Sequence, residues 1–184
     1  MKIKCNICST GFYKLRHGKY GAFGGCSNYP VCRSTMKIHD LVFEFFVEKG
    51  INVYRWKKEC YKCGKHTDVY SYFLYYELEQ LDESYQSVHG LGLGDVPWID
   101  NRLKHEIPSI KECYSKFTDS TYIANMCVYC GVLQGKNYVV DDPHEIMTEL
   151  FHDRSMEQYF FRKISIDEKD IELRNEFYHL FKDE

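Results

Sequence analysis

Apolar residues recur along the chain with two periods, and these predict a mixture of helices and strands. Between Asp40 and Lys49 the spacing is helical, with Asp40 expected as the cap and Gly50 as the stop. The apolar side of this helix would consist of Leu41, Val42, Phe45 and Phe46. Runs rich in β-branched and aromatic residues predict strands at 51–56, 68–76, 121–126, 136–140 and 158–166. A glycine-rich loop is expected at 87–98.

Three more segments carry helix signals. Residues 100–114 have a helical pattern that is interrupted by a proline. The dipeptide Asp142-Pro143 supplies a cap and a first-turn proline for a helix expected to end near residue 152. Asp167 is expected to open the last helix. The apolar face of that helix would be formed by Ile171, Phe177, Tyr178 and Phe181. Strands and helices in this order predict an α+β protein.

The composition is that of a globular protein with a core. Hydrophobic residues make up 44% and charged residues 28% of the 184 positions, which is far from the composition of a disordered chain. The longest apolar runs, such as 45–47 and 73–76, are too short to span a bilayer. The lysines near the start are not followed by an apolar segment, so no signal peptide is expected. We therefore expect a cytoplasmic protein that does not contact membranes.

The charge is distributed unevenly. Residues 1–39 contain seven Lys or Arg and no Asp or Glu, whereas the whole chain has a formal net charge of −3. The remaining residues therefore carry a net charge of −10. A basic segment on an acidic protein indicates two roles, although a short basic stretch is more often just a solvated surface.

Eight of the nine cysteines fall into pairs with metal-ligand spacing. The pairs are Cys5/Cys8, Cys26/Cys32, Cys60/Cys63 and Cys127/Cys130. Zinc is bound by four thiolates at about 2.3 Å, and a C-x-x-C turn presents two of them to one side of the ion. Disulfides are the main alternative, but the chain shows no export signal. Iron–sulfur ligation and a redox pair fit the spacing less well.

Local pairing of these cysteines predicts two zinc ions per chain. The first site would close the loop 9–25, and the second would close the much longer loop 64–126. The longer loop costs about 1.2 kcal/mol more in chain entropy, and zinc binding of about 10–16 kcal/mol outweighs this cost. We expect each site to sit in a zinc ribbon, a small antiparallel sheet with zinc knuckles, and several helices to accompany the two ribbons.

The surroundings of the first site carry a family resemblance. The segment reads C-x2-C, then the spacer 9–25, then C-x5-C, and glycine and aromatic positions accompany the cysteines. The matching residues include Gly11, Arg16, Gly18, Tyr20, Gly21, Phe23, Gly25, Pro30 and Thr35. Over residues 3–38 the chain resembles the four-cysteine zinc-ribbon module of type IA DNA topoisomerases. It departs from that pattern at Asn6, where the family usually has proline.

The resemblance implies binding of single-stranded DNA through basic and aromatic side chains. The candidate contact residues are Lys14, Arg16, Lys19, Tyr20, Phe23, Tyr29 and Arg33. A base stacked on an aromatic ring contributes about 1–3 kcal/mol without sequence readout. Each ring could instead serve the core of the ribbon, because so small a module has little other apolar material.

Nothing in the sequence favours catalysis. The chain is too short for the nucleophile, metal cluster and large domains of a topoisomerase, and no two histidines have metal-binding spacing. A zinc ion with four thiolates has no open position for water. Asp68, Glu77 and Glu79 could be imagined as nuclease carboxylates, but solvated strand-edge positions explain them more simply.

The sequence therefore predicts two domains with one main function. Residues 1–39 would form the topoisomerase-type ribbon, and 40–184 an α+β domain around the split second site. The expected function is nucleic-acid binding by a non-catalytic accessory or regulatory factor, with single-stranded DNA as the favoured partner. The alternative is a protein-interaction module that docks on a larger nucleic-acid enzyme.

Overall fold

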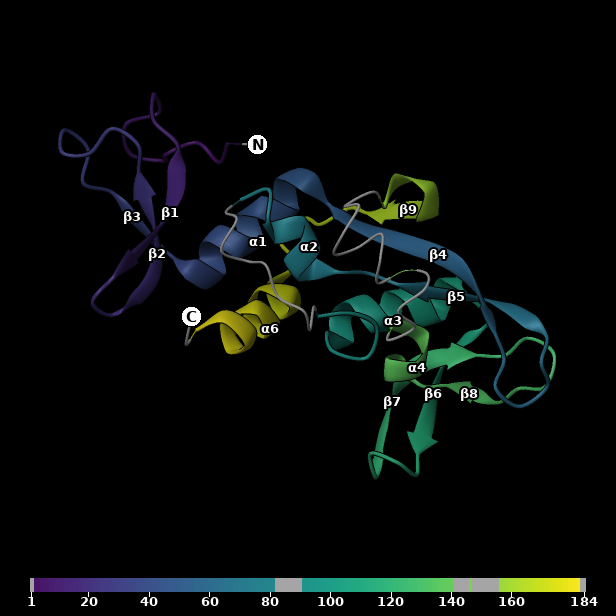
Figure 1. Ribbon diagram of the computed structural model, residues 1–184. Helices are drawn as coiled ribbons and strands as arrows, with labels where there is room; N and C mark the ends of the chain where they lie inside the picture. Colours follow the sequence, from purple (N-terminus) through teal and green to yellow (C-terminus); the bar gives the residue numbers. More distant parts are fainter. Residues whose placement is uncertain (1, 82–90, 141–145, 147–155, 183–184) are drawn as a thin grey trace. The chain divides into compact units, whose positions relative to one another are not determined.

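Figure 1 shows the computed structural model, which describes residues 2–81, 91–140, 146 and 156–182. Three small antiparallel sheets alternate with helices, so the predicted α+β class is confirmed. The strand orders are β1-β2-β3, β5-β4-β9 and β6-β7-β8. Most of the helix predicted after Asp142 lies outside the described residues. Within the described ranges, no helix is long and apolar enough to cross a membrane.

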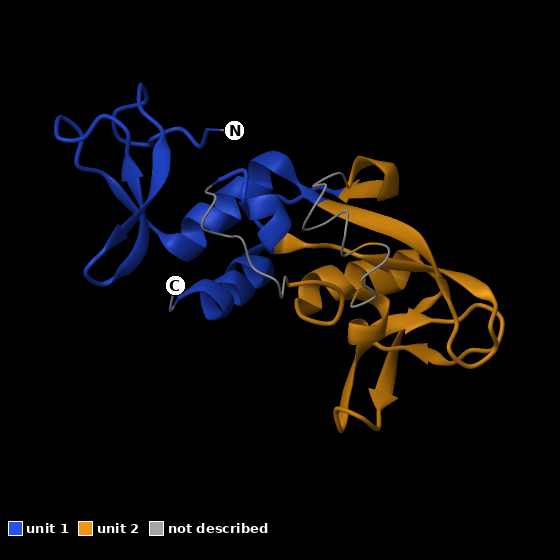
Figure 2. Ribbon diagram, in the orientation of Figure 1, with its two compact units in different colours: residues 1–51, 75–87, 164–184 blue, residues 52–74, 88–163 orange. Residues whose placement is uncertain are grey.

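The chain divides into two compact units (Figure 2). The first consists of residues 1–51, 75–87 and 164–184, and the second of residues 52–74 and 88–163. Unit 1 therefore combines the N-terminal ribbon with segments from the middle and the end of the chain. Whether residues 1–39 also fold as a domain of their own stays a prediction.

Unit 1 contains the first sheet and a helical core. Its sheet consists of β1 (Tyr13–Gly18), β2 (Gly21–Cys26) and β3 (Thr35–Lys37). Its helices are α1 (Ile38–Lys49), α2 (Leu74–Leu78) and α6 (Ile171–Phe181). The ring of Phe177 lies 5.7 Å from the rings of both Phe46 and Phe181, and all three side chains are fully buried. These rings fasten α6 to α1.

Helix α1 begins earlier than predicted. It starts at Ile38, and Lys37 precedes it without a side-chain cap. The carboxylate of Asp40 accepts hydrogen bonds from the guanidinium of Arg174 on α6, at 3.0 and 2.7 Å. The predicted capping role of Asp40 is therefore wrong, because its side chain is used between helices. Gly50 ends the helix as expected, with a φ of +74° and its N–H bonded to Phe46.

Three further predictions are corrected by the packing. The strand predicted at 68–76 ends at Ser71, and α2 follows it. Glu77, expected on a solvated edge, is buried within α2 and forms an ion pair with Lys49. The buried face of α6 is formed by Leu173, Phe177 and Phe181, which are spaced by four residues. Ile171 and Tyr178, predicted on that face, are exposed.

Unit 2 contains the other two sheets. One consists of β4 (Ile51–Glu59), β5 (His66–Ser71) and β9 (Phe160–Ile164), and the other of β6 (Ile110–Ser115), β7 (Ser120–Met126) and β8 (Leu133–Gln134). The helices are α3 (Pro97–Glu106), α4 (Lys136–Val140) and the short 3₁₀ helix η3 (Glu157–Tyr159). Buried Asn125 joins the sheets: it accepts from the Tyr70 N–H and donates to the Tyr70 carbonyl, both at 2.9 Å.

Two secondary-structure predictions fail in unit 2. The helix predicted at 100–114 is α3 only as far as Glu106, and residues 110–115 form strand β6 along β7. Cys113, which falls within the predicted helix, accordingly lies on a strand. Residues 136–140, predicted as a strand, form helix α4. Of the two tryptophans, Trp56 is buried, whereas Trp98 is half-buried with Arg102 over its ring.

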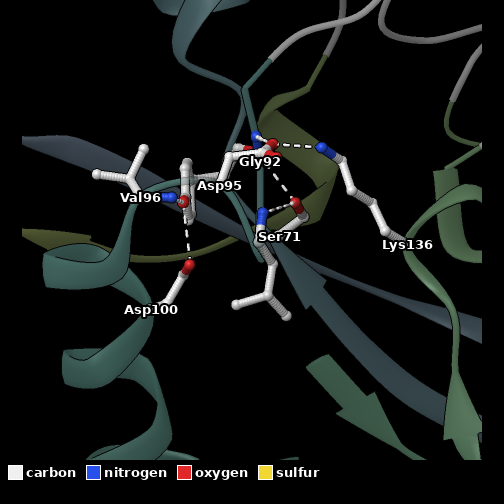
Figure 3. A network of polar contacts seen from close by, with 8 residues as sticks. Ser71, Gly92, Asp95, Val96, Asp100 and Lys136 are labelled. Carbon is white, nitrogen blue, oxygen red and sulfur yellow. Dashed lines mark hydrogen bonds and ion pairs between the residues drawn. The ribbon is translucent and has the colours of Figure 1, made fainter. Parts of the chain in front are cut away.

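The described part of the glycine-rich loop is held against β5 by polar contacts (Figure 3). The Leu93 N–H donates to Ser71 Oγ at 3.1 Å, and the Gly92 N–H donates to Asp95 at 2.8 Å. Asp95 also forms an ion pair with Lys136 at the start of α4. These bonds fix the segment that leads into α3.

Candidate metal centres and nucleic-acid interface

The first four predicted cysteines come together in unit 1. Cys5 and Cys8 lie in the turn before β1, Cys26 ends β2, and Cys32 follows in the loop to β3. Their sulfurs lie within 4.8 Å of one another, with Cys5 and Cys32 at 3.8 Å and Cys8 and Cys26 at 3.6 Å. Four sulfurs about 2.3 Å from a zinc ion in a tetrahedron are about 3.8 Å apart, whereas a disulfide bond is about 2.05 Å long. The geometry fits one zinc ion.

Amide groups surround this first cluster. Hydrogen bonding from the backbone of Cys8, with a smaller contribution from Ile7, lowers the pKa of the Cys5 thiol to about 6. The Asn28 side chain donates to Cys8 Sγ at 3.6 Å, and its backbone N–H donates to Cys26 Sγ at 3.4 Å. Such donors favour the thiolate, which is the form that binds metal.

The residue that departs from the family pattern has a structural role. The hydroxyl of buried Tyr13 donates to Asn6 Oδ1 at 2.6 Å and lies 2.7 Å from Ser34 Oγ. Asn6 therefore supplies an acceptor that a proline would lack. Tyr13 belongs to the core of the ribbon and is not available for contact with a ligand.

The second set of four cysteines comes together in unit 2. Cys60 and Cys63 lie between β4 and β5, and Cys127 and Cys130 lie between β7 and β8. Cys60 Sγ is 3.7 Å from Cys130 Sγ, and Cys63 Sγ is 3.8 Å from Cys127 Sγ. These separations again match a zinc tetrahedron. The predicted pairing across the long insertion 64–126 is therefore confirmed, and this set can also hold one zinc ion.

The two knuckles of the second cluster have the same backbone. Gly64 and Gly131 have φ values of +69° and +67°, and their N–H groups donate to the carbonyls of Cys60 and Cys127 at 2.9 Å. A positive φ favours glycine, which explains why a glycine follows the second cysteine in each of these two pairs. Burial acts to raise the pKa of the Cys60 thiol, but hydrogen bonds from the backbone of Cys63 and Lys62 outweigh it and lower the pKa to about 6.

Sequence reasoning missed the side-chain amides around the sulfurs. Gln134 is fully buried and donates from Nε2 to Cys60 Sγ at 3.4 Å. It plays for the second cluster the part that Asn28 plays for the first. Asn28 lies within the segment that resembles the topoisomerase module, but its position beside the sulfurs was not predicted, and Gln134 has no distinctive spacing. Only the tertiary structure places them against the metal ligands.

One face of the ribbon sheet combines cations and aromatic rings. Residues directly opposite each other in neighbouring strands share a face, and Arg16 pairs with Phe23, which pairs with Lys37. Lys14 lies on the same face two residues before Arg16. Phe12, two residues earlier still, has the ammonium of Lys14 5.3 Å from its ring centroid. The exposed Lys14, Arg16 and Lys37 thus surround two half-buried rings.

A close approach between Arg16 and β2 shapes this face. A Cβ atom at Gly25 would lie 2.5 Å from Cδ and 2.7 Å from Nε of Arg16. A side chain at Gly25 would therefore displace the exposed, flexible Arg16 side chain from its path across the sheet. At the end of the β1–β2 hairpin Tyr20 is 94% exposed, and the ammonium of Lys19 lies 5.5 Å from the Tyr20 ring centroid.

The predicted contact residues fall into two groups. Those on the sheet face or the hairpin are Lys14, Arg16, Lys19, Tyr20 and Phe23. Tyr29 and Arg33 are exposed but lie outside the strands, in the loop between β2 and β3. Phe12 and Lys37 were missed, although the alternation that begins at Lys14 and Arg16 could have found Phe12. Contact with nucleic acid stays a prediction for all of them.

Two of the carboxylates considered for a nuclease site are used in ion pairs. Glu77 is paired with Lys49, and Asp68 is paired with Lys57 at 3.2 Å. Asp68 lies on β5 and Glu77 on α2, so Glu77 is not at the strand edge where it was expected.

Comparison with known proteins adds one family match. No curated protein and no solved structure matches the chain significantly. The matched segment ends just inside α1 and contains all four cysteines of the first cluster. The family points to zinc-dependent nucleic-acid binding. Residues 2–40 match the family described as the topoisomerase DNA-binding C4 zinc finger, and the resemblance noted in the sequence is thereby confirmed.

Proposed function

We propose that this protein binds single-stranded DNA on the sheet face of its N-terminal ribbon, as a non-catalytic accessory factor. The observation that carries the proposal is the row formed by Arg16, Phe23 and Lys37 across three neighbouring strands. A row of cations with a ring between them matches the alternating phosphates and bases of a strand. Residues 1–39 contain no Asp or Glu, so no carboxylate of the ribbon opposes phosphate at this surface.

The charge of the ribbon sets the expected strength of binding. The seven Lys and Arg of residues 1–39 are partly offset by a zinc–tetrathiolate centre of about −2, which leaves about +5. Three to five neutralised phosphates would give a log–log salt dependence with a slope of roughly −2 to −4. We therefore expect modest affinity that falls steeply with salt.

Fluorescence anisotropy with a labelled oligonucleotide tests the proposal. The zinc-loaded full chain is titrated against single-stranded DNA, duplex DNA and RNA at 50 and 200 mM salt, and single-stranded DNA should bind best. Arg16→Ala should weaken binding to all sequences alike, while Phe23→Ala should weaken single-strand binding more than duplex binding. Lys169→Ala is the matched control, since it removes an exposed lysine outside the ribbon.

Two outcomes would contradict the proposal. If no nucleic acid binds at 50 mM salt, the ribbon has another partner and the protein-interaction alternative takes precedence. If Lys169→Ala weakens binding as much as Arg16→Ala, the effect reflects net charge and not a surface on the sheet.

A further inference from the structure

Unit 2 contains a hollow of about 570 Å³ next to its zinc cluster. Its wall includes four aromatic rings, one aliphatic side chain and one cation: Tyr61, Phe117, Tyr122, Tyr138, Leu133 and Lys136. We propose that this hollow is a second binding surface for single-stranded nucleic acid, with bases stacked on its rings. The inference rests on the proposed function for the class of ligand, but it concerns different residues.

The rings come from separate elements that the second zinc cluster holds together. Tyr61 lies in the knuckle of Cys60 and Cys63, and Tyr138 lies on α4. Their ring centroids are 5.6 Å apart with planes at 78°. The Tyr138 hydroxyl donates to the carbonyl of Glu59, just before the knuckle, so this ring is fixed in place. A zinc-bound knuckle would therefore present a preformed aromatic wall.

Phe117 gives the strongest indication of a ligand. It lies at the turn between β6 and β7 and is 91% exposed, so it contributes almost nothing to the core of unit 2. Tyr61 is likewise 60% exposed. Large rings that remain in water beside a hollow are typical of binding surfaces. Ser120 and Thr118, whose hydroxyls lie 2.8 Å apart, add hydrogen-bonding groups for the edges of a base.

Lysine side chains surround the hollow, and the zinc–tetrathiolate centre of about −2 beside it offsets part of their charge. Among the residues that the structure describes, the wall contains no Asp or Glu, and its one cation, Lys136, is ion-paired with Asp95. The ammonium of Lys58 lies 4.8 Å from the Tyr138 ring centroid, and Lys62, Lys65 and Lys116 are exposed on the adjoining segments.

The carboxylates near the hollow have partners of their own. Asp119 accepts a hydrogen bond from the Tyr114 hydroxyl, and Asp95 is ion-paired with Lys136. Glu59 is exposed next to the knuckle, where it is outnumbered by lysines. Four rings against one aliphatic side chain favour a stacked base over an aliphatic peptide.

Photocrosslinking distinguishes this surface from the ribbon. The zinc-loaded full chain is irradiated with a thirty-nucleotide oligothymidylate that carries 5-iododeoxyuridine, and the crosslinked peptides are identified by mass spectrometry. We expect crosslinks at Phe117 or Tyr61 as well as within residues 12–37. Crosslinks confined to the ribbon would overturn this inference and leave the proposed function intact. Crosslinks confined to the hollow would support the inference and overturn the proposed role of the ribbon.

A substitution at Phe117 tests how much its ring contributes to the affinity for single-stranded DNA. In an Arg16→Ala background, which weakens the ribbon, Phe117→Ala should reduce affinity for the same oligonucleotide between about fivefold and a hundredfold. Phe160→Ala, at a half-exposed ring on β9 outside the hollow, is the matched control. Both variants should keep two zinc ions, which shows that they fold. If Phe117→Ala binds as tightly as its control, no base stacks there and an apolar peptide becomes the better candidate occupant.

Discussion

A single glycine leaves the space that the sulfurs of the first cluster occupy. Gly11 faces the first cluster so closely that a Cβ atom there would lie 2.7 Å from Cys26 Sγ and 3.1 Å from Asn28 Cγ. Both neighbours belong to the cluster or donate to it. The glycine shared with the topoisomerase module is therefore required by space at the metal ligands.

The variant Gly11→Ala should lose zinc from the first site. The added methyl group must displace Cys26 Sγ, and displaced ligands or their hydrogen-bond partners typically cost about 10–100-fold in metal affinity. Competition with a chromogenic chelator, followed by native mass spectrometry, measures the loss. Gly135→Ala is the control, because no atom lies within 4 Å of the Cβ position there. Equal zinc retention by both variants would contradict this account.

Helix α3 begins at a buried polar contact between elements. The Tyr72 hydroxyl donates to Asp100 at 2.9 Å and accepts from the Val96 N–H at 3.1 Å. Figure 3 labels Asp100 and Val96 at the start of the helix. Burial is the largest cause that raises the pKa of Asp100 to about 7, with the nearby Asp95 carboxylate adding to it. The fold thus prefers the protonated side chain at the start of this helix.

The stability of the protein should therefore depend on pH through Asp100. A carboxyl group with a raised pKa stabilises the fold fully below its unfolded pKa near 4, and this contribution is lost as pH rises towards 7. Asp100→Asn stays neutral, so its stability relative to the natural protein should improve by on the order of 2 kcal/mol between pH 5 and pH 8. Urea unfolding at both pH values measures this double difference, in which the contribution of zinc cancels.

The exposed Asp167 provides the comparison for this measurement. Asp167→Asn makes the same chemical change at an exposed position, so the change in its stability difference between the two pH values is the baseline for Asp100→Asn. A change for Asp100→Asn no larger than this baseline would show that the buried carboxyl group is not the source of the pH dependence.

At the scale of the whole molecule, each unit contains one set of four cysteines. We expect two zinc ions per chain, because both sets have the sulfur separations of a zinc tetrahedron. Native mass spectrometry of the chain produced under reducing conditions measures the number. A mass with one ion would mean that the second set does not close, and a mass four hydrogens lower without metal would indicate two disulfides.

The two sites should differ in how much structure depends on them. Cys60→Ser should unfold unit 2, because the four ligands of the second zinc site lie in loops of two different sheets and connect these sheets. Cys5→Ser should disorder chiefly residues 1–37, since α1 and α6 retain their ring contacts. Hydrogen exchange of each variant shows the extent of unfolding, with Cys113→Ser as the control outside both sets. Loss of protection in α1 after Cys5→Ser would mean that the ribbon and the helices unfold together.

The zinc clusters show how much the sequence determined alone. Cysteine spacing was sufficient to predict both sets and their pairing, because a C-x-x-C turn brings two sulfurs together whatever surrounds it. The family resemblance likewise depends on local glycine, aromatic and cysteine positions. Local patterns also predicted strands with clear alternation or β-branched runs, such as β4 and β7, and the end of helix α1 at Gly50, although α1 begins before the predicted cap Asp40.

Tertiary contacts decided the rest. Residues 136–140 have the side chains of a strand, yet they form a helix in which Lys136 pairs with Asp95 and Tyr138 reaches Glu59. Residues 110–115 become a strand because β7 offers a ladder of backbone partners. Glu77 is buried because Lys49 neutralises it. The partners of Lys136, Tyr138 and Glu77 are distant in the sequence, and the free energy of a contact between distant residues leaves no trace in local periodicity.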